Sequence, residues 1–212
     1  AERQPAPGDR RRPAGDPGDT RAVDADLPRD PPPQRRTLTT IFAIVGLEFT
    51  LSFWAATYLH DSVGITRDTS VALVSTLYAA NLVGRLIASR LARRMATAVV
   101  LRLSLATAFA GLPVLLGAGN AVVAGVGLAL TGIGVGGTFP LASSLHVAAS
   151  RRSADQALGQ ILTVAGTGQI VGPLAAGGLA QVIGLRLSLL VLPALVLLAA
   201  VTTRRVPRRT DR

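Results

Sequence analysis

Six runs of about 20 apolar residues constrain this 212-residue chain more than any other feature. A helix of about 20 residues has the length that crosses the ~30 Å hydrocarbon core of a bilayer. Only 16% of the residues are charged, against about a quarter in soluble domains. We therefore predict an all-α membrane protein with six transmembrane helices. The spans are expected at residues 40–59, 70–91, 97–117, 121–148, 157–182 and 185–203.

Residues 1–36 differ in composition from the spans. They are rich in Pro, Gly, Asp and Arg and contain almost no large apolar side chains, so they bury too little surface to offset the entropy of ordering. We predict a disordered cytoplasmic tail at 1–36, a six-helix bundle at 37–206 and a basic cytoplasmic tail at 207–212. The chain starts at Ala1 without a Met, as expected of a fragment.

The arginines of the connecting segments alternate between the two sides of the membrane. One side carries Arg35, Arg36, Arg85, Arg90, Arg93, Arg94, Arg102, Arg151, Arg152, Arg204, Arg205, Arg208, Arg209 and Arg212. The other side carries Arg67, flanked by Asp61 and Asp68, and Arg186. Because cytoplasmic loops are enriched in basic residues, we expect both termini in the cytoplasm. Basic residues that are all Arg are typical of a GC-rich bacterial genome, so we predict a bacterial inner membrane protein.

The composition and two local motifs exclude several classes of function. The formal charge of +10 lies in short loops and does not form the basic surface that nucleic acid needs. The absence of Cys excludes disulfides and thiolate metal sites. Residues 132–137 have the glycine spacing of a dinucleotide site but lie inside an apolar span with no strand before them. Ser143 and Ser144 are too close to His146 on one helix to act as nucleophile and base, and His146 is expected at the membrane interface. We expect no enzyme activity, cofactor or metal.

An offset of 88 residues relates two parts of the chain. Residues 83–92 match residues 171–180 at six of ten positions, and the same offset pairs Asn81 with Gln169. In a chain this rich in Ala, Leu and Gly such identities also arise by chance, so repeat and coincidence both remain open. Two copies of three spans each would have opposite orientations, which is the inverted repeat found in transporters.

Residues 84–94, at the end of the second span, resemble the loop motif of the major facilitator superfamily. Ser89 begins the core of the motif and Arg94 matches a family Arg, whereas Arg93 stands where the family has Asp and Ala96 replaces a glycine. Without the acid, a salt bridge that gates the cytoplasmic face cannot be assigned, and the loop would serve as an orientation signal and lipid contact. The predicted motif residues are Gly84, Arg85, Arg90, Arg93 and Arg94.

Further segments are similar to the second six-helix half of the same family. Residues 46–54, 132–145 and 168–173 resemble its first, fourth and fifth helices, and the tail resembles the linker between halves; the resemblance covers about 38–206. It implies a bundle of two inverted three-helix repeats, half of the family's fold. It also implies alternating access to a midplane cavity that holds a small solute. The missing partner would be an N-terminal six-helix half or a second copy.

Glu48 is the acidic residue deepest within a span. An ionised group there costs about 2.5 kcal/mol or more unless it faces a polar cavity, and a membrane interior favours the neutral carboxyl group. Glu48 is therefore either a residue of the cavity that carries a proton or binds substrate, or a structural hydrogen-bonding group. The same two interpretations hold for the amides of the second and fifth spans. The predicted substrate and coupling cavity comprises Glu48, Ser52, Asn81, Thr138 and Gln169.

Glycines four residues apart in the fourth and fifth spans allow helix backbones to approach closely. The predicted packing residues are Gly132, Gly136, Gly168 and Gly172. Taken together, the sequence predicts transport of a small solute by half of a secondary transporter, coupled to protons through Glu48. The alternative is a non-transporting six-span scaffold or a degenerate remnant of a transporter.

Overall fold

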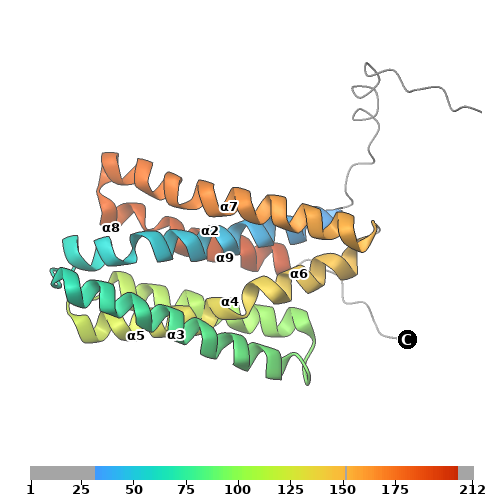
Figure 1. Ribbon diagram of the computed structural model, residues 1–212, viewed down its shortest axis with the longest axis horizontal. Coiled ribbons are helices and arrows are strands. Elements are labelled where there is room, and N and C mark those ends of the chain that lie inside the picture. Colours follow the sequence, from blue (N-terminus) through green and yellow to red (C-terminus); the bar gives the residue numbers. More distant parts are fainter. Residues whose placement is uncertain (1–31, 151, 205–212) are drawn as a thin grey trace, which may run out of the picture. The chain divides into compact units, whose positions relative to one another are not determined.

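The computed structural model describes residues 32–150 and 152–204, in which every regular element is a helix. Six helical segments are long and apolar enough to cross a membrane, so the prediction of an all-α six-span protein is confirmed. Two of the segments are interrupted (Figure 1). The elements are α2 (Pro32–Asp61), α3 (Arg67–Leu91), α4 (Thr97–Leu116), α5 (Ala121–Gly136), α6 (Thr138–Ala149), α7 (Ala154–Ile183), α8 (Leu185–Ser188) and α9 (Val191–Arg204).

Helix α2 begins earlier than the composition indicates. Residues 1–31 of the predicted tail, and the basic tail at 207–212, lie outside the described residues, but 32–36 are helical and do not continue the tail. Proline is tolerated in the first turn of a helix, where its missing N–H has no partner to lose. Gln34 is buried, and its side-chain amide donates to Oε1 of Gln160 in α7 at 2.9 Å. A tertiary contact therefore stabilises a segment that looks too polar to be part of the bundle.

The fourth span is divided into α5 and α6 at Gly137. Pro140, one turn later, has no N–H for the carbonyl group of Gly136. Nε of Arg85 in α3 donates to that carbonyl oxygen at 3.3 Å. A neighbouring helix thus supplies the hydrogen bond that the proline removes, as membrane proteins require in the absence of water.

The sixth span is divided into α8 and α9 in the same way. Pro193 leaves the Leu189 carbonyl group without its helical donor, and the backbone N–H of Leu192 donates to it at 3.0 Å. The Leu189 carbonyl group therefore keeps a hydrogen bond at the break.

The bundle consists of two similar groups of helices. Helix α2 packs against α7 and α9, and α5 packs against α3 and α4 (Figure 1). Gly84 of α3 lies against Ile133 of α5, and 88 residues later Gly172 of α7 lies against Gly46 of α2. An equivalent contact therefore recurs at the predicted offset, in helices of opposite direction. The two inverted three-helix repeats are the first three spans (α2 to α4) and the last three (α5 to α9), and each packed group combines helices of both repeats.

The core and the outer surface are both apolar. The largest fully buried side chains come mostly from α2 and α4, such as Leu47, Tyr58 and Leu105, whereas Leu86 and Leu174 are exposed on α3 and α7. Such an apolar surface is suited to contact with the acyl chains of lipids and not to contact with water. The protein is a multi-pass membrane protein.

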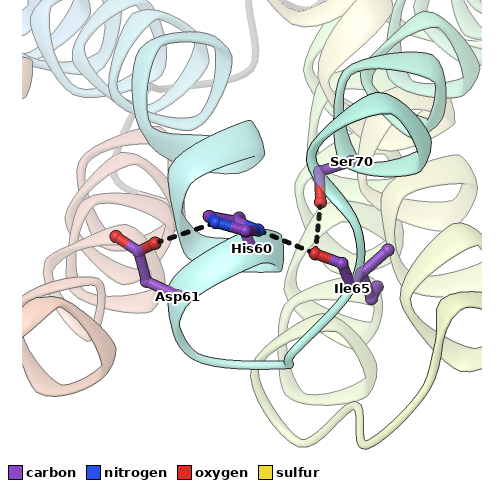
Figure 2. A network of polar contacts seen from close by, with 4 residues as sticks. All are labelled: His60, Asp61, Ile65 and Ser70. Atoms are coloured by element: carbon purple, nitrogen blue, oxygen red, sulfur yellow. Dashed lines mark hydrogen bonds and ion pairs between the residues drawn. The ribbon is translucent and has the colours of Figure 1, made fainter.

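The connection between α2 and α3 is a short closed turn (Figure 2). Nδ1 of His60 lies 2.9 Å from the carbonyl oxygen of Ile65, which also accepts from the Ser70 hydroxyl at 3.5 Å. Gly64 has φ of 79°, a conformation that other residues adopt only with strain. Nε2 of His60 lies 4.0 Å from a carboxylate oxygen of Asp61. This turn fixes how α3 enters the bundle.

Replacing Gly84 with Ala should lower the melting temperature of the detergent-solubilised chain. The new Cβ would overlap the Ile133 carbonyl group, and overpacking of this kind costs about 1–3 kcal/mol. Gly159→Ala is the matched control, because nothing lies within 4 Å of a Cβ there. Equal melting temperatures for the two variants would contradict the close approach of α3 and α5.

Candidate functional site

A carboxyl group and an amide meet near the middle of the bundle. Nδ2 of Asn81 in α3 donates to Oε1 of Glu48 in α2 at 2.9 Å. Both residues, with Ser52 and Tyr78, line a very small cavity of about 10 Å³ between α2, α3 and α5, which has no room for a solute. Three of the five residues predicted for the cavity therefore come together, and the Asn81 amide gives the Glu48 carboxyl group a hydrogen bond that lipid could not provide.

Arg85 belongs to this site, although the sequence analysis assigned it to the loop. It lies six residues before the end of α3, about 9 Å along the helix from Leu91 at 1.5 Å per residue. It follows Asn81 by four residues, a spacing that brings two side chains to one face of a helix. Its Nε donates to the Gly136 carbonyl oxygen at 3.3 Å, and Val135, one residue before Gly136, lines the Glu48 cavity. The spacing from Asn81 is the sequence signal that could have identified it.

A larger groove extends from this cavity toward the Asp61 end of α2. Its volume is about 1080 Å³. Its walls are mainly aromatic and aliphatic, and its lining residues are Phe49, Ser52, Phe53, Trp54, Tyr78, Gln169, Ile170, Pro173, Leu174, Gly177, Gly178, Ala180 and Gln181. Ser52 and Tyr78 line both the groove and the Glu48 cavity. The groove therefore contains Gln169, the fourth predicted cavity residue, and adjoins the carboxyl group.

The aromatic wall of the groove is held rigidly. Nε1 of Trp54 donates to the Pro173 carbonyl oxygen at 3.0 Å. Phe53 packs edge-to-face on Trp54 with ring centroids 5.2 Å apart, and Gly177 is so close that a Cβ there would lie 2.7 Å from the indole ring. Because its one polar atom is already bonded, Trp54 offers a ligand only an apolar surface.

A second, smaller groove lies at the position related by the 88-residue offset. Its volume is about 320 Å³. Its residues are Arg85, Ala88, Ser89, Gly137, Phe139, Pro140 and Leu141. Pro140 corresponds to Ser52 of the first groove, and Arg85 corresponds to Pro173. The inverted repeat therefore produces one groove toward each end of the bundle, with the Glu48 cavity between them.

The remaining predicted residues lie elsewhere. Thr138 is 1% exposed and its hydroxyl donates to the Val135 carbonyl oxygen at 2.6 Å, so it stabilises the break between α5 and α6 and is not brought to the groove. Gly84 lies inside α3, within the second predicted span. Arg90 lies in the last turn of α3, and Arg93 and Arg94 lie in the turn that follows.

The predicted packing glycines lie at helix contacts. A Cβ on Gly132 would be 2.6 Å from the Leu77 carbonyl oxygen, and one on Gly136 would overlap the Asn81 carbonyl oxygen. On the other side of the bundle, a Cβ on Gly168 would be 2.7 Å from the Phe42 carbonyl oxygen, while Gly172 packs on α2 as described above.

A polar network at the start of α2 was not predicted from the sequence. His146 is fully buried in α6, and its Nδ1 lies 2.8 Å from the Thr37 hydroxyl oxygen. Gln34, three residues earlier, donates to Gln160 of α7 and, at 3.3 Å, to the Ser150 hydroxyl. The network therefore ties α2 to α6 and α7 at the end opposite Asp61.

Comparison with known proteins identifies related chains. A family profile described as Major Facilitator Superfamily matches residues 4–166. An uncharacterized transporter of Sinorhizobium fredii, y4wD, is 30% identical over 148 residues, which are 70% of this chain and 39% of that protein. The chain thus spans well under two thirds of this relative.

Two solved structures have the same fold. The fucose:proton symporter FucP of E. coli has a TM-score of 0.76 and 17% identity, over 92% of this chain and 48% of that one. A second FucP structure, a Major Facilitator Superfamily transporter in the outward conformation, has a TM-score of 0.71 and 18% identity, over 93% and 48%. The chain aligns with about half of each.

Asn81→Leu should destabilise the chain by about 1–3 kcal/mol, because it leaves the Glu48 carboxyl group without its donor. Thermal unfolding in detergent measures the change. The control is Ser89→Ala on the same helix, where the exposed hydroxyl donates only to its own helix at Leu86. If Asn81→Leu unfolds at the same temperature as Ser89→Ala, the hydrogen bond to Glu48 does not contribute to the stability of the fold.

Proposed function

Because the chain belongs to the Major Facilitator Superfamily, we propose that it forms one six-helix half of a secondary transporter. The observation that carries the proposal is the Glu48 carboxyl group, bonded to Asn81 at 2.9 Å and adjoining a groove of about 1080 Å³. An ionisable group inside a span is expensive and marks a solute or ion pathway. No chemical bond of the solute is altered in this proposal.

The proposed cycle is alternating access, with a second six-helix half completing the cavity. The aromatic groove lies toward the Asp61 end of the bundle and the Arg85 groove toward the opposite end, which suits access from each side in turn. The partner is either an N-terminal half or a second copy of this chain. We assign both termini to the cytoplasm of a bacterium, since Arg93 and Arg94 lie on that side and Asp61 on the other.

Glu48 is proposed to carry the coupling proton. The Asn81 amide can donate to the carboxyl group in either protonation state, so Glu48 keeps its hydrogen-bonding partner after the proton has left. The name of the E. coli relative, a fucose:proton symporter, supports proton coupling as a mechanism within this fold.

The proposed solute is less hydroxylated than a sugar. Each sugar hydroxyl group buried in a site needs a hydrogen-bonding partner, but the groove offers few polar side chains beyond Ser52, Tyr78, Gln169 and Gln181. Its wall suits a flat, mainly apolar molecule that carries a small number of polar groups.

A flat apolar solute should quench the fluorescence of the chain. Trp54 is the sole tryptophan and lies in the groove wall, so its emission reports occupancy directly. In nanodiscs we expect saturable quenching by planar aromatic solutes and none by fucose. Phe49→Ala should weaken binding about tenfold, as expected for the loss of one aromatic contact of ~1.4 kcal/mol.

Phe109→Ala is the matched control, because Phe109 and Phe49 are both 38% exposed but Phe109 lies on α4, outside the groove. Saturable quenching by fucose alone would contradict the apolar solute. Equal effects of the two variants would show that the quenching arises from ligand dissolved in the bilayer.

Glu48→Gln should abolish the dependence of uptake on a proton gradient, because an amide cannot release a proton. The measurement is uptake of a quenching solute into proteoliposomes, with and without a pH gradient, using the chain together with its partner half. Asp155→Asn at the start of α7 is the control for loss of one carboxylate. An unchanged pH profile in Glu48→Gln would remove the proton-carrier role, and absence of uptake under every gradient would favour a non-transporting scaffold.

A further inference from the structure

A basic depression lies at the turn between α3 and α4. It has a volume of about 800 Å³ and is lined by Arg90, Leu91, Arg93, Arg94 and Met95, which we call the basic turn. The backbone N–H groups of Arg94 and Met95 both donate to the Leu91 carbonyl oxygen at 2.9 Å. The three arginines are therefore held on a short hydrogen-bonded turn and do not belong to a long loop.

The described part of the chain provides no counter-charge for this turn. Within residues 32–150 and 152–204, no carboxylate lies within 4.0 Å of the three guanidinium groups. Asp61 ends α2 and Asp68 lies at the start of α3, at the opposite end of α3 from the basic turn. Glu48 is in the middle of α2. Asp155 begins α7, which packs mainly on α2 and not on α3 or α4.

The position of the turn indicates where its counter-charge comes from. Helices α3 and α4 are both long and apolar enough to cross the membrane, so the turn that joins them lies at the level of the lipid headgroups. Leu91 is half-buried against the core and Met95 is 40% exposed. The depression thus combines three cations with an apolar side. These two features complement the anionic phosphate group and the adjoining acyl chain of a phospholipid.

We propose that the basic turn binds the phosphate group of an anionic phospholipid. Guanidinium groups donate paired hydrogen bonds to phosphate oxygens, and basic pockets at the ends of membrane helices recognise anionic headgroups. The start of an acyl chain lies against Met95 and Leu91. A free phosphate ion would use the guanidinium groups but leave the apolar side unoccupied. The site is independent of whether the chain transports a solute.

Native mass spectrometry of the detergent-solubilised chain tests the site. The chain is titrated with phosphatidylglycerol and with phosphatidylcholine of the same acyl composition, and we expect tighter binding of phosphatidylglycerol. Each replacement of Arg90, Arg93 or Arg94 by Gln should weaken that binding about fivefold, the effect expected of one arginine at an anionic surface. A variant with all three arginines replaced by Lys keeps the charge and should retain the preference for phosphatidylglycerol. It controls for a loss of fold or of membrane orientation in the Gln variants.

Arg67→Gln is the matched control, because it removes one arginine from the same helix at its other end. It should leave binding unchanged. The proposal is overturned if the triple Gln variant keeps the preference for phosphatidylglycerol, or if Arg67→Gln weakens binding as much as Arg93→Gln. Full displacement of the lipid by millimolar inorganic phosphate would assign the turn to a free anion and overturn the lipid as its ligand.

Discussion

The bundle depends on direct backbone contact between helices at glycine. Lipid is as apolar as leucine, so no hydrophobic force draws one membrane helix to another, and close packing has to do so. Gly84 lets α3 reach the backbone of α5, and Gly172 lets α7 reach Gly46 of α2. Helices α3 and α2, which carry Asn81 and Glu48, are thus each held in place by a glycine contact with a different neighbour.

Polar groups in the bundle are arranged by the same absence of water. The carbonyl group freed by Pro140 accepts a hydrogen bond from Arg85, and the carboxyl group of Glu48 accepts one from Asn81. At the far end of α2, Gln34 bonds to Gln160 of α7. In each case the partner comes from another helix, which makes the polar contacts a measure of how the spans are arranged.

The sequence predicted the elements that follow from length and hydropathy, namely six spans, their order and the inverted repeat. It was less reliable where a polar residue has a tertiary partner: Pro32 to Arg36 were assigned to the tail and Arg85 to the loop, and the buried contact between His146 and Thr37 was not predicted. Hydropathy records the cost of a polar side chain in lipid but not the hydrogen bond that offsets it. Thr138 was assigned to the cavity, but its hydroxyl bonds to the Val135 carbonyl oxygen three residues before it, a local partner that needs no cavity.

One helical turn of α3 serves two other spans of the bundle. The Arg85 guanidinium group donates to the Gly136 carbonyl oxygen at the break between α5 and α6, and Asn81, four residues earlier, donates to Glu48 of α2. A displacement of α3 along its axis would therefore strain both hydrogen bonds together. The break in the fourth span and the carboxyl group of the first span are thus mechanically coupled through a single turn.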